Sequence, residues 1–485
     1  MRRWVGVVAG CALVASFAAH ASGQSAPSGS DAAWLQRVRA AASARGFQGG
    51  AQSILVVERA SGVELFAKNA ERALAPASTQ KVLTALAALE AFGAGYQFVT
   101  EVFAPAPPGA DGVVASLAIR GADPAMTGEQ WWRLAHDLRA LGVAEVAGGI
   151  ALDDSLLDAE RWHPSWQPVS ARAYHAPIGA MSANYGAFRV VVSPGASVGA
   201  AARVLVDPPL AYFPLTSTVR TGRPGGGASI TVGRAQDAAG AAERVSVGGS
   251  IALGADRVEI WRSVIDPTAY AAAVLGEQLA AAGIRVRGAI ARGNVPADAH
   301  PLYEFKGLPL RTTADLLLKY SNNFIAEALL KQLGHLDTGE PGSWKNGAAA
   351  LRARLAALGL PLAGCAIVDG SGLSRDDRVS ARLLVGALRS ADRSFAVGPD
   401  LLAGLPIAAE DGTLRTRAEG ARGLVRAKTG TLDGVTALAG WARTLRGREV
   451  VFAVISNGHR HGDVEAIAAI DAFATALVQD ENPPD

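Results

Sequence analysis

Cysteine is nearly absent from the sequence, with two residues, Cys11 and Cys365, among 485. Cys11 lies in an N-terminal segment that we expect to be cleaved off, so Cys365 would have no partner for an intramolecular disulfide. Small exported proteins commonly depend on disulfides, whereas a chain of this length can bury a core large enough to fold without them. Length alone predicts roughly two to three domains.

Long apolar runs are also missing, with one exception at the N-terminus. Arg2 and Arg3 precede an apolar run over Trp4–Ala18, and Ala19–Ala21 matches the small-residue site at which signal peptides are cleaved. This run is too short for a membrane span, which needs about 20 apolar residues. We therefore expect residues 1–21 to be a cleaved signal peptide and the mature chain to be exported, with at most a peripheral association with the membrane.

The chain carries almost no net charge, with 46 Lys and Arg against 44 Asp and Glu. Cleavage of the signal peptide removes two of the basic residues and no acidic one, so the two counts become equal at 44. Proteins that bind nucleic acids carry a basic excess. We therefore expect no nucleic-acid partner.

Apolar periodicity divides the chain into three stretches. Before residue 100 it predicts a helix, a hairpin and a second helix that begins after Ala75. A β-rich stretch with two helices follows, and the breaker-rich segment Ala104–Gly109 is a candidate domain boundary at its start. After residue 295 helices are predicted, then three strands and a closing helix. The three predicted strands span 424–428, 435–442 and 450–456.

These elements favour an α/β (α+β) fold built on one antiparallel sheet of roughly five strands. The first hairpin would pair with the last three strands, the terminal helices would cover one face, and the middle helices would cover the other. The β-rich stretch would then be an insertion into a loop of this domain. The expected parts are 22–100, the inserted 101–295 and the closing 296–485. Within the insertion the expected subdomains are roughly 101–172 with 260–295, and 173–259.

Lys81 stands at an unusual position, in the first turn of the helix that follows Ala75. Positions i and i+3 of a helix share a face, so the Lys81 amine can reach the hydroxyl of Ser78. The positive end of the helix dipole lowers the pKa of a lysine placed there, and a neutral lysine can act as the base that activates a serine nucleophile. The pattern S-x-x-K is common by chance, however, and a capping serine beside a solvated lysine is the simpler interpretation of this pair alone.

Two further motifs favour the catalytic interpretation of Ser78 and Lys81 over the simpler one. Ser321-Asn322-Asn323 lies on a short connection between predicted helices, and Lys428–Thr431 ends a predicted strand. The motifs S-x-x-K, S-x-N and K-T-G, in this order, form the set found in β-lactamases and penicillin-binding proteins. The sequence therefore resembles the superfamily of penicillin-recognising serine enzymes.

The spacing of the motifs narrows the resemblance. Ser78 and Ser321 are 243 residues apart, whereas Ser321 and Lys428 are 107 apart. A long insertion between the first two motifs is typical of low-molecular-mass class C penicillin-binding proteins, which are D-alanyl-D-alanine carboxypeptidases and endopeptidases. The segments DGSGLSR at 369–375 and DGTLRTR at 411–417 agree with that class. The resemblance covers essentially the whole mature chain and implies a β-lactamase/transpeptidase-like sheet with two inserted β-rich domains.

The resemblance also implies roles for the motif residues. Ser78 would be the acylated nucleophile, Lys81 the base that activates it, and Ser321 the group that relays the proton to the leaving amine. The backbone N–H groups of Ser78 and Thr431 would form the oxyanion hole.

The remaining residues would bind substrate. Asn323 would hold the substrate's amide, and Gly430 would let the ligand backbone approach closely. The free carboxylate of a D-Ala-D-Ala terminus calls for a fixed cation and hydroxyl donors. The resemblance implies Lys428 as this cation and Thr429 and Thr431 as these hydroxyl donors. Asp153 and Arg375 would recognise the side-chain amine and the backbone of the stem peptide.

The implied protein is a periplasmic serine-type D-Ala-D-Ala carboxypeptidase that trims peptidoglycan stem peptides and is acylated by β-lactam antibiotics. Cross-links between D-alanine and diaminopimelate are a further expected substrate. We expect no cofactor and no metal, because the histidines of the segment His459–His461 fit a polar loop better than a metal site.

Two alternatives remain at the level of sequence. A β-lactamase would need a dedicated carboxylate or tyrosine near the acyl bond for fast deacylation, and the motifs reveal no such residue. A sensor or wall-scaffolding protein would use the same pocket without catalysis. A sensor would need a membrane span, and a scaffold would tolerate the loss of Ser78 or Lys81, both of which are present.

Overall fold

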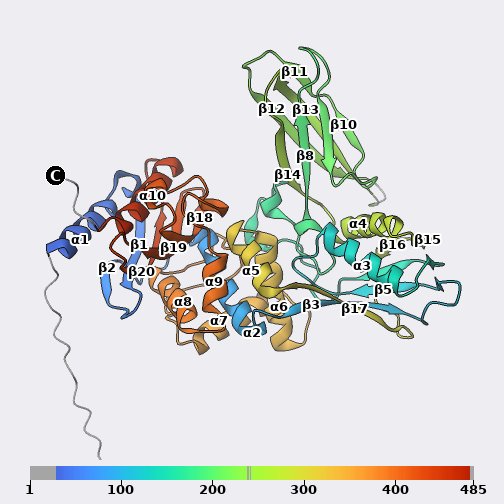
Figure 1. Cartoon of the computed structure of the whole chain (residues 1–485), viewed down its shortest axis with the longest axis horizontal. Helices are drawn as coiled ribbons and strands as arrows, with labels where there is room; N and C mark the ends of the chain where they lie inside the picture. The colour runs from blue at the N-terminus through green and yellow to red at the C-terminus, as the bar shows by residue number, and fades with distance from the viewer. Residues whose placement is uncertain (1–28, 238–239, 241, 481–485) are drawn as a thin grey trace, which may run out of the picture.

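The computed structural model describes residues 29–237, 240 and 242–480. The predicted signal peptide, residues 1–21, therefore lies outside the described residues. Figure 1 shows an elongated molecule with one mixed helix-and-strand body at one end and β-rich parts extending from the other. No helix in the described part of the chain is long and apolar enough to cross a membrane.

A five-stranded sheet unites the two ends of the described chain. Its order is β18-β19-β20-β1-β2, and every neighbouring pair is antiparallel. The first hairpin therefore pairs with the last three strands, as predicted. The strands are β1 (Ala51–Glu58), β2 (Glu64–Lys68), β18 (Val425–Leu432), β19 (Val435–Arg443) and β20 (Glu449–Asn457).

The strand that carries the third motif is longer than predicted. The prediction ended it at Lys428, but β18 continues to Leu432 and turns into β19 through Asp433 and Gly434. Gly434 has a positive φ of 71°, which suits a tight hairpin. The motif Lys428–Thr431 is consequently held in the register of the sheet, opposite Thr436–Ala439.

Helices cover both faces of this sheet. On one face α1 (Gly29–Ala41) and α10 (Asp463–Val478) pack around Trp34, Phe452 and Phe473, all three fully buried. On the other face lie α2 (Gln80–Phe92), α5 (Leu310–Lys319), α6 (Asn323–Thr338), α7 (Trp344–Ala357), α8 (Ala381–Arg393) and α9 (Gly398–Gly404). The terminal helices thus cover one face and the middle helices the other.

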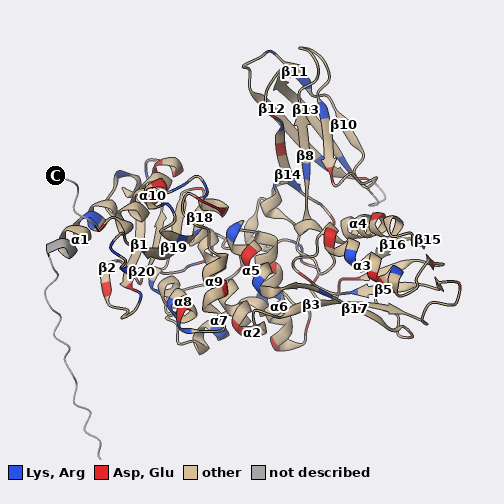
Figure 2. Cartoon of the chain, in the orientation of Figure 1, with Lys and Arg blue, Asp and Glu red and all other residues tan. Residues whose placement is uncertain are grey.

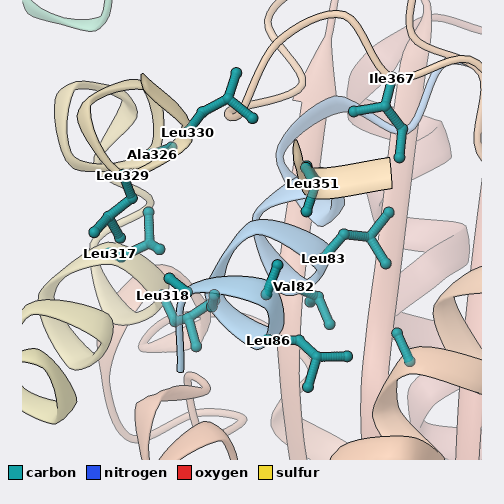
Figure 3. Close-up of a cluster of buried hydrophobic side chains, with 14 of the residues drawn as sticks. Val82, Leu83, Leu86, Leu317, Leu318, Ala326, Leu329, Leu330, Leu351 and Ile367 are labelled. Atoms are coloured by element: carbon teal, nitrogen blue, oxygen red, sulfur yellow. The ribbon is translucent and has the colours of Figure 1, made fainter. Parts of the chain in front are cut away.

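The core of the second face surrounds α2, the helix that begins just after Ser78. Figure 3 shows Val82, Leu83 and Leu86 of α2 among leucines of α5, α6 and α7. Each of these three side chains is fully buried, and burial of one such side chain contributes about 1.5–3 kcal/mol. The first turn of α2 is therefore fixed in place by its own apolar face.

The inserted region contains a second five-stranded sheet, of order β16-β7-β5-β3-β17. It is formed by β3 (Gln97–Ala104), β5 (Leu117–Arg120), β7 (Ile150–Asp153), β16 (Ile290–Arg292) and β17 (His300–Pro309), and α3 (Gly128–Ala140) and α4 (Pro267–Ala281) share its core. A small sheet joins β4 (Val113–Val114), β6 (Glu145–Val146) and β15 (Arg285–Val286).

Two more sheets form the arm that rises in Figure 1. The first has the order β14-β8-β9, and the second is centred on β13. Their strands are β8 (Ala187–Ser193), β9 (Arg203–Asp207), β10 (Leu215–Ser217), β11 (Arg220–Gly222), β12 (Ala228–Gln236), β13 (Glu243–Ala252) and β14 (Val258–Ser263).

The expected domain boundaries do not coincide with the sheets. β3 runs through residue 100, and β17 begins after residue 295, yet the two strands pair with each other. Ala104–Gly109 follows the end of β3 inside the inserted region. We therefore propose that the insertion reaches from β3 to β17.

Acidic and basic residues are interspersed along the chain in the sheet domain and in the insertion (Figure 2). This mixture agrees with the small net charge of the sequence.

Candidate active site

Ser78 and Lys81 lie at the start of α2. Ser78 belongs to a 3-10 turn, η2 (Ala77–Thr79), and Lys81 is in the first turn of the helix. Lys81 Nζ is 2.8 Å from Ser78 Oγ and 2.8 Å from the carbonyl oxygen of Ser371. Ala77 has a φ of 47°, and such strain in a residue other than glycine is typical of functional sites.

Burial sets the protonation of Lys81. The side chain is fully buried, which lowers its pKa from 10.5 to about 7. The charges of Asp369, Glu327 and Asp377 act in the opposite direction and raise it in part. At neutral pH a large fraction of Lys81 is therefore the neutral amine that can accept a proton from Ser78.

Glu327, on α6, holds the loop that contacts Lys81. Its carboxylate accepts hydrogen bonds from the backbone N–H groups of Gly370 (2.9 Å) and Ser371 (2.7 Å), and from the indole of Trp344 (2.8 Å). Burial, and then the charge of Asp369, raises the pKa of Glu327 to about 7. None of the sequence motifs pointed to Glu327. The signal that could have found it is a glutamate within an apolar helical run, because a buried carboxylate needs polar partners.

A second lysine–serine pair faces the first. Lys428 Nζ, on β18, donates to Ser321 Oγ at 2.8 Å and to its neighbour's carbonyl, that of Thr429, at 2.9 Å. Lys428 is fully buried, and burial followed by the charge of Lys81 lowers its pKa well below the usual value. Ser321 has a φ of 58° and connects α5 to α6.

The rest of the second motif starts α6. Asn322 caps the helix by accepting from the N–H of Ile325 at 3.1 Å, and Asn323 is its first residue. The Asn323 side-chain amide donates to the carbonyl of Tyr174 at 3.0 Å. Tyr174 belongs to the inserted region, so the insertion contacts the second motif directly.

The third motif packs against the turn that carries Ser78. A Cβ on Gly430 would lie 2.8 Å from the carbonyl oxygen of Pro76, so glycine is needed for this close approach. The hydroxyls of Thr429 and Thr413 lie 2.7 Å apart, and Thr431 is exposed.

A cavity of about 560 Å³ joins these elements. Ser78, Ser321, Asn323 and Thr431 all line it, and Lys81 and Lys428 lie behind their serines. The inserted region supplies part of the wall, with Trp166, Tyr174 and His175 among the lining residues. The three motifs, up to 350 residues apart, thus converge on one cavity.

Arg375 and Asp153 have different surroundings. Arg375 is exposed, lines the cavity and donates to the carbonyl of Asp433 at 3.0 Å. Asp153 is not among the residues that line the cavity: it is buried at the end of β7, where its two oxygens accept from the N–H groups of Ser155 (3.0 Å) and Val295 (3.1 Å). This position does not support the expected role of Asp153 in recognition of the stem peptide, because both its oxygens join backbone segments.

Trp166 acts as an anchor. Its indole donates to Asp369 at 2.9 Å, and Asp369 accepts from the backbone of its own loop at Gly372 (2.6 Å) and Ser374 (2.7 Å). The described residues contain no group of three or more His, Cys, Asp or Glu placed to hold a metal ion. Within the segment His459–His461, the imidazole Nε2 of His459 lies 2.7 Å from a carboxylate oxygen of Asp463.

The antiparallel sheet and the two lysine–serine pairs around one cavity define the class of penicillin-recognising serine enzymes. A family model described as the D-Ala-D-Ala carboxypeptidase 3 (S13) family matches residues 36–477. The chain belongs to this family of serine peptidases.

Individual relatives agree with this membership. A D-alanyl-D-alanine carboxypeptidase of Actinomadura sp. (strain R39) is 34% identical over 450 residues, which are 89% of this chain and 82% of that protein. The D-alanyl-D-alanine carboxypeptidase DacB of Haemophilus influenzae is 26% identical over 411 residues, 80% of this chain and 82% of that protein.

Solved structures share the fold. The crystal structure of penicillin binding protein 4 from Haemophilus influenzae has a TM-score of 0.75 at 24% identity and covers 92% of this chain and 98% of its own. A second structure of that protein, complexed with a β-lactam, has a TM-score of 0.70 at 25% identity. It covers 91% of this chain and 98% of its own.

Proposed function

We propose that this chain removes the terminal D-alanine from peptidoglycan stem peptides through an acyl-enzyme on Ser78. Membership of the D-Ala-D-Ala carboxypeptidase family supports the class of reaction. One observation carries the assignment of residues: two fully buried lysines each contact a serine of the same cavity at 2.8 Å. Such a pair of activated hydroxyls suits a reaction that needs both a nucleophile and a proton relay.

Acylation begins when Ser78 Oγ attacks the carbonyl carbon of the penultimate D-alanine. The proton of the hydroxyl passes to the neutral amine of Lys81, and the oxyanion is held by the backbone N–H groups of Ser78 and Thr431. The carbon–nitrogen bond then breaks. The leaving nitrogen takes a proton through the hydroxyl of Ser321, and D-alanine departs as the free amino acid.

Deacylation returns the enzyme to its starting state. Water attacks the ester carbonyl, the carbon–oxygen bond to Ser78 breaks, and Ser78 recovers its proton. The product is a peptide shortened by one residue with a new carboxylate. Lys81, again neutral after the first step, is the base placed to take the proton of the water.

Substrate recognition uses other groups in and behind the cavity wall. The free carboxylate of the terminal D-alanine would face Lys428 and the hydroxyls of Thr429 and Thr431, and Asn323 would hold an amide. Arg375 is an exposed cation that lines the cavity, and we assign it to the stem peptide.

The same chemistry extends to penicillins and to cross-links. A β-lactam presents a carboxylate and a strained amide to the same groups, and the structural relative from Haemophilus influenzae was solved with such a compound. Cleavage of a cross-link differs only in the leaving amine. Since these substrates lie outside the cytoplasm, we place the enzyme in the periplasm, exported by the signal peptide expected at residues 1–21.

The test is the mass of the intact protein after incubation with benzylpenicillin. The parent is expected to gain one long-lived penicilloyl group, and Ser78→Ala none. Ser165→Ala removes a serine that lines the same cavity and serves as the matched control, which is still acylated. Release of D-alanine from a stem pentapeptide is then measured on the three proteins.

The outcomes separate the alternatives. Rapid loss of penicillin without a lasting adduct would identify a β-lactamase. A lasting adduct without release of D-alanine would indicate a penicillin-binding sensor or scaffold. An adduct that persists in Ser78→Ala would show that another residue is the nucleophile.

A further inference from the structure

A second cavity, of about 500 Å³, opens beside the catalytic one. Three residues line both cavities: Tyr174, Ser321 and Asn323. One wall comes from the junction of α5 and α6. The other comes from the insertion, through the 3-10 turns η4 (Ala173–His175) and η5 (Asn184–Gly186) and strand β14. The mechanism proposed above uses only the shared edge of this cavity.

Aromatic side chains dominate its lining. Tyr174, Trp261 and Tyr320 are 44%, 52% and 69% exposed, which is unusual for side chains of this size, and Tyr185 lines the cavity with them. Exposed aromatic rings gathered around one hollow mark a binding surface.

Neighbouring residues hold the ring of Trp261 in position. The guanidinium of Arg189 lies over the Trp261 ring, 5.5 Å from its centroid, and is itself paired with Asp207 and Glu259. Tyr185 lies in a turn with left-handed backbone, because its φ is 59°. Such conformations in residues other than glycine cluster at binding and catalytic sites.

The lining also selects by charge. Among the described residues that line this cavity none is charged, and its polar side chains are tyrosines, amides and one serine. The catalytic cavity, in contrast, contains Arg172, Arg375 and two aspartates, Asp433 and Asp463. A stem peptide carries several charges, whereas the sugars of the glycan strand that bears it are largely neutral, with apolar ring faces and acetamido groups.

We propose that the second cavity binds an N-acetylated sugar of the glycan strand. The sugar ring would stack on Trp261 and Tyr320, and the side-chain amide of Asn322 lies within the same lining to meet its acetamido group. The inserted region would thereby favour stem peptides that are still attached to glycan. This inference rests on the proposed function, because the shared residues connect the sugar to the scissile bond.

The test compares two substrates: a stem pentapeptide, and the same pentapeptide attached to the disaccharide of N-acetylglucosamine and N-acetylmuramic acid. The parent is expected to have the higher kcat/KM on the disaccharide pentapeptide, through a lower KM. Trp261→Ala should reduce that preference about tenfold, as the loss of an aromatic anchor does. Trp261→Phe, which keeps a ring, should retain most of it.

Trp132→Ala is the matched control. Trp132 is 46% exposed on α3 and lines neither cavity, so its loss should leave the preference unchanged. Equal rates of the parent on the two substrates would overturn the proposal. A Trp261→Ala variant that slows both substrates equally would also overturn it, because the cavity would then hold peptide and not sugar.

A binding measurement decides the matter independently of catalysis. The Ser78→Ala protein is titrated with the disaccharide without peptide, and tryptophan fluorescence is followed. Saturable quenching that disappears in the Ser78→Ala, Trp261→Ala double variant supports the sugar site even if no D-alanine is ever released. Absence of quenching at millimolar disaccharide would contradict it even if the carboxypeptidase activity is established.

Discussion

At the scale of single residues, the proposed chemistry depends on how the protein keeps the Lys81 amine neutral without leaving it unpaired. Burial lowers its pKa to about 7, and the nearby carboxylates stop the shift from going further. The amine keeps two partners, Ser78 Oγ and the carbonyl of Ser371. A base with a pKa close to the working pH combines a useful neutral fraction with a useful basicity.

The pH dependence of acylation follows from this pKa. Below pH 7 Lys81 is mostly protonated and cannot accept the proton of Ser78, so the rate of acylation by benzylpenicillin should fall about tenfold per pH unit. Above pH 7 the rate should level off. Quenched-flow mass spectrometry between pH 5 and 9 measures the profile, and circular dichroism at each pH controls for unfolding. A rate that does not change between pH 5 and 7 would contradict the assignment of Lys81.

Glu327→Gln tests the carboxylate behind Lys81. Loss of its negative charge should lower the pKa of Lys81 and move the rising limb of the profile to lower pH, by a fraction of a pH unit because Glu327 itself titrates near 7. The new glutamine would also place its NH2 group, a donor, against backbone N–H groups that now donate to a carboxylate oxygen. This mismatch should cost about 1–3 kcal/mol in the free energy of unfolding.

Trp344→Phe is the control for that variant. It removes one hydrogen bond to Glu327 and keeps the charge, so stability should fall while the limb of the pH profile stays in place. If the rising limb of the pH profile were unchanged in Glu327→Gln, the charge of Glu327 would have no effect on the pKa of Lys81.

At the scale of elements, the nucleophile is positioned by a loop from another part of the chain. Gly372 follows the carbonyl that holds Lys81, and it packs against the backbone of Ala77. A Cβ added to Gly372 would overlap the carbonyl oxygen of Ala77, and its φ is 76°. The loop and the 3-10 turn of Ser78 therefore fit together only with glycine at this position.

Gly372→Ala should therefore slow acylation and destabilise the fold. Gly364→Ala is a close control, because its φ is 70° and nothing lies within 4 Å of its added Cβ. Both substitutions should cost about 1 kcal/mol for the left-handed backbone. Only Gly372→Ala should lower the free energy of unfolding, measured in urea, by more than this amount. Only that variant should also be acylated more slowly. Equal behaviour of the two variants would mean that the contact with Ala77 does not position the nucleophile.

At the scale of the whole molecule, the insertion is tied to the sheet domain through a buried charge. Lys331 of α6 is fully buried and donates to Asp158 at 2.6 Å and to the carbonyl of Glu160 at 2.8 Å. Its ammonium also lies 3.5 Å from the centroid of the Trp344 ring. These contacts hold a segment of the insertion that leads to the wall of the catalytic cavity.

Asp158→Ala should leave the buried Lys331 ammonium without a carboxylate partner, and cost about 3 kcal/mol in the free energy of unfolding. Asp337→Ala removes the partner of Arg354 in a more exposed pair and should cost less than about 1 kcal/mol. Urea denaturation of both variants measures the difference. Equal losses would show that the buried pair does not stabilise the contact between insertion and sheet domain.

The sequence by itself determined the central sheet and the identity of three motifs. Strand and helix patterns are local, so the hairpin at 51–68 and the three final strands were predicted close to their observed positions. The motifs are short and chemically distinctive, which is why residue order and spacing alone pointed to Ser78, Ser321 and Lys428. The contacts of Asp153 lie outside such patterns, since its carboxylate accepts hydrogen bonds from the backbone N–H groups of Ser155 and Val295.

Only the tertiary structure decided how the motif residues are supported. Glu327 reaches the loop at Ser371 across 44 residues, and Trp166 reaches Asp369 across 203. No local pattern encodes such contacts, because they arise when separate elements pack and bury polar groups that must then find partners. The aromatic cavity beside the catalytic one has the same origin: its two walls come from the insertion and from the sheet domain, and neither wall alone encloses a site.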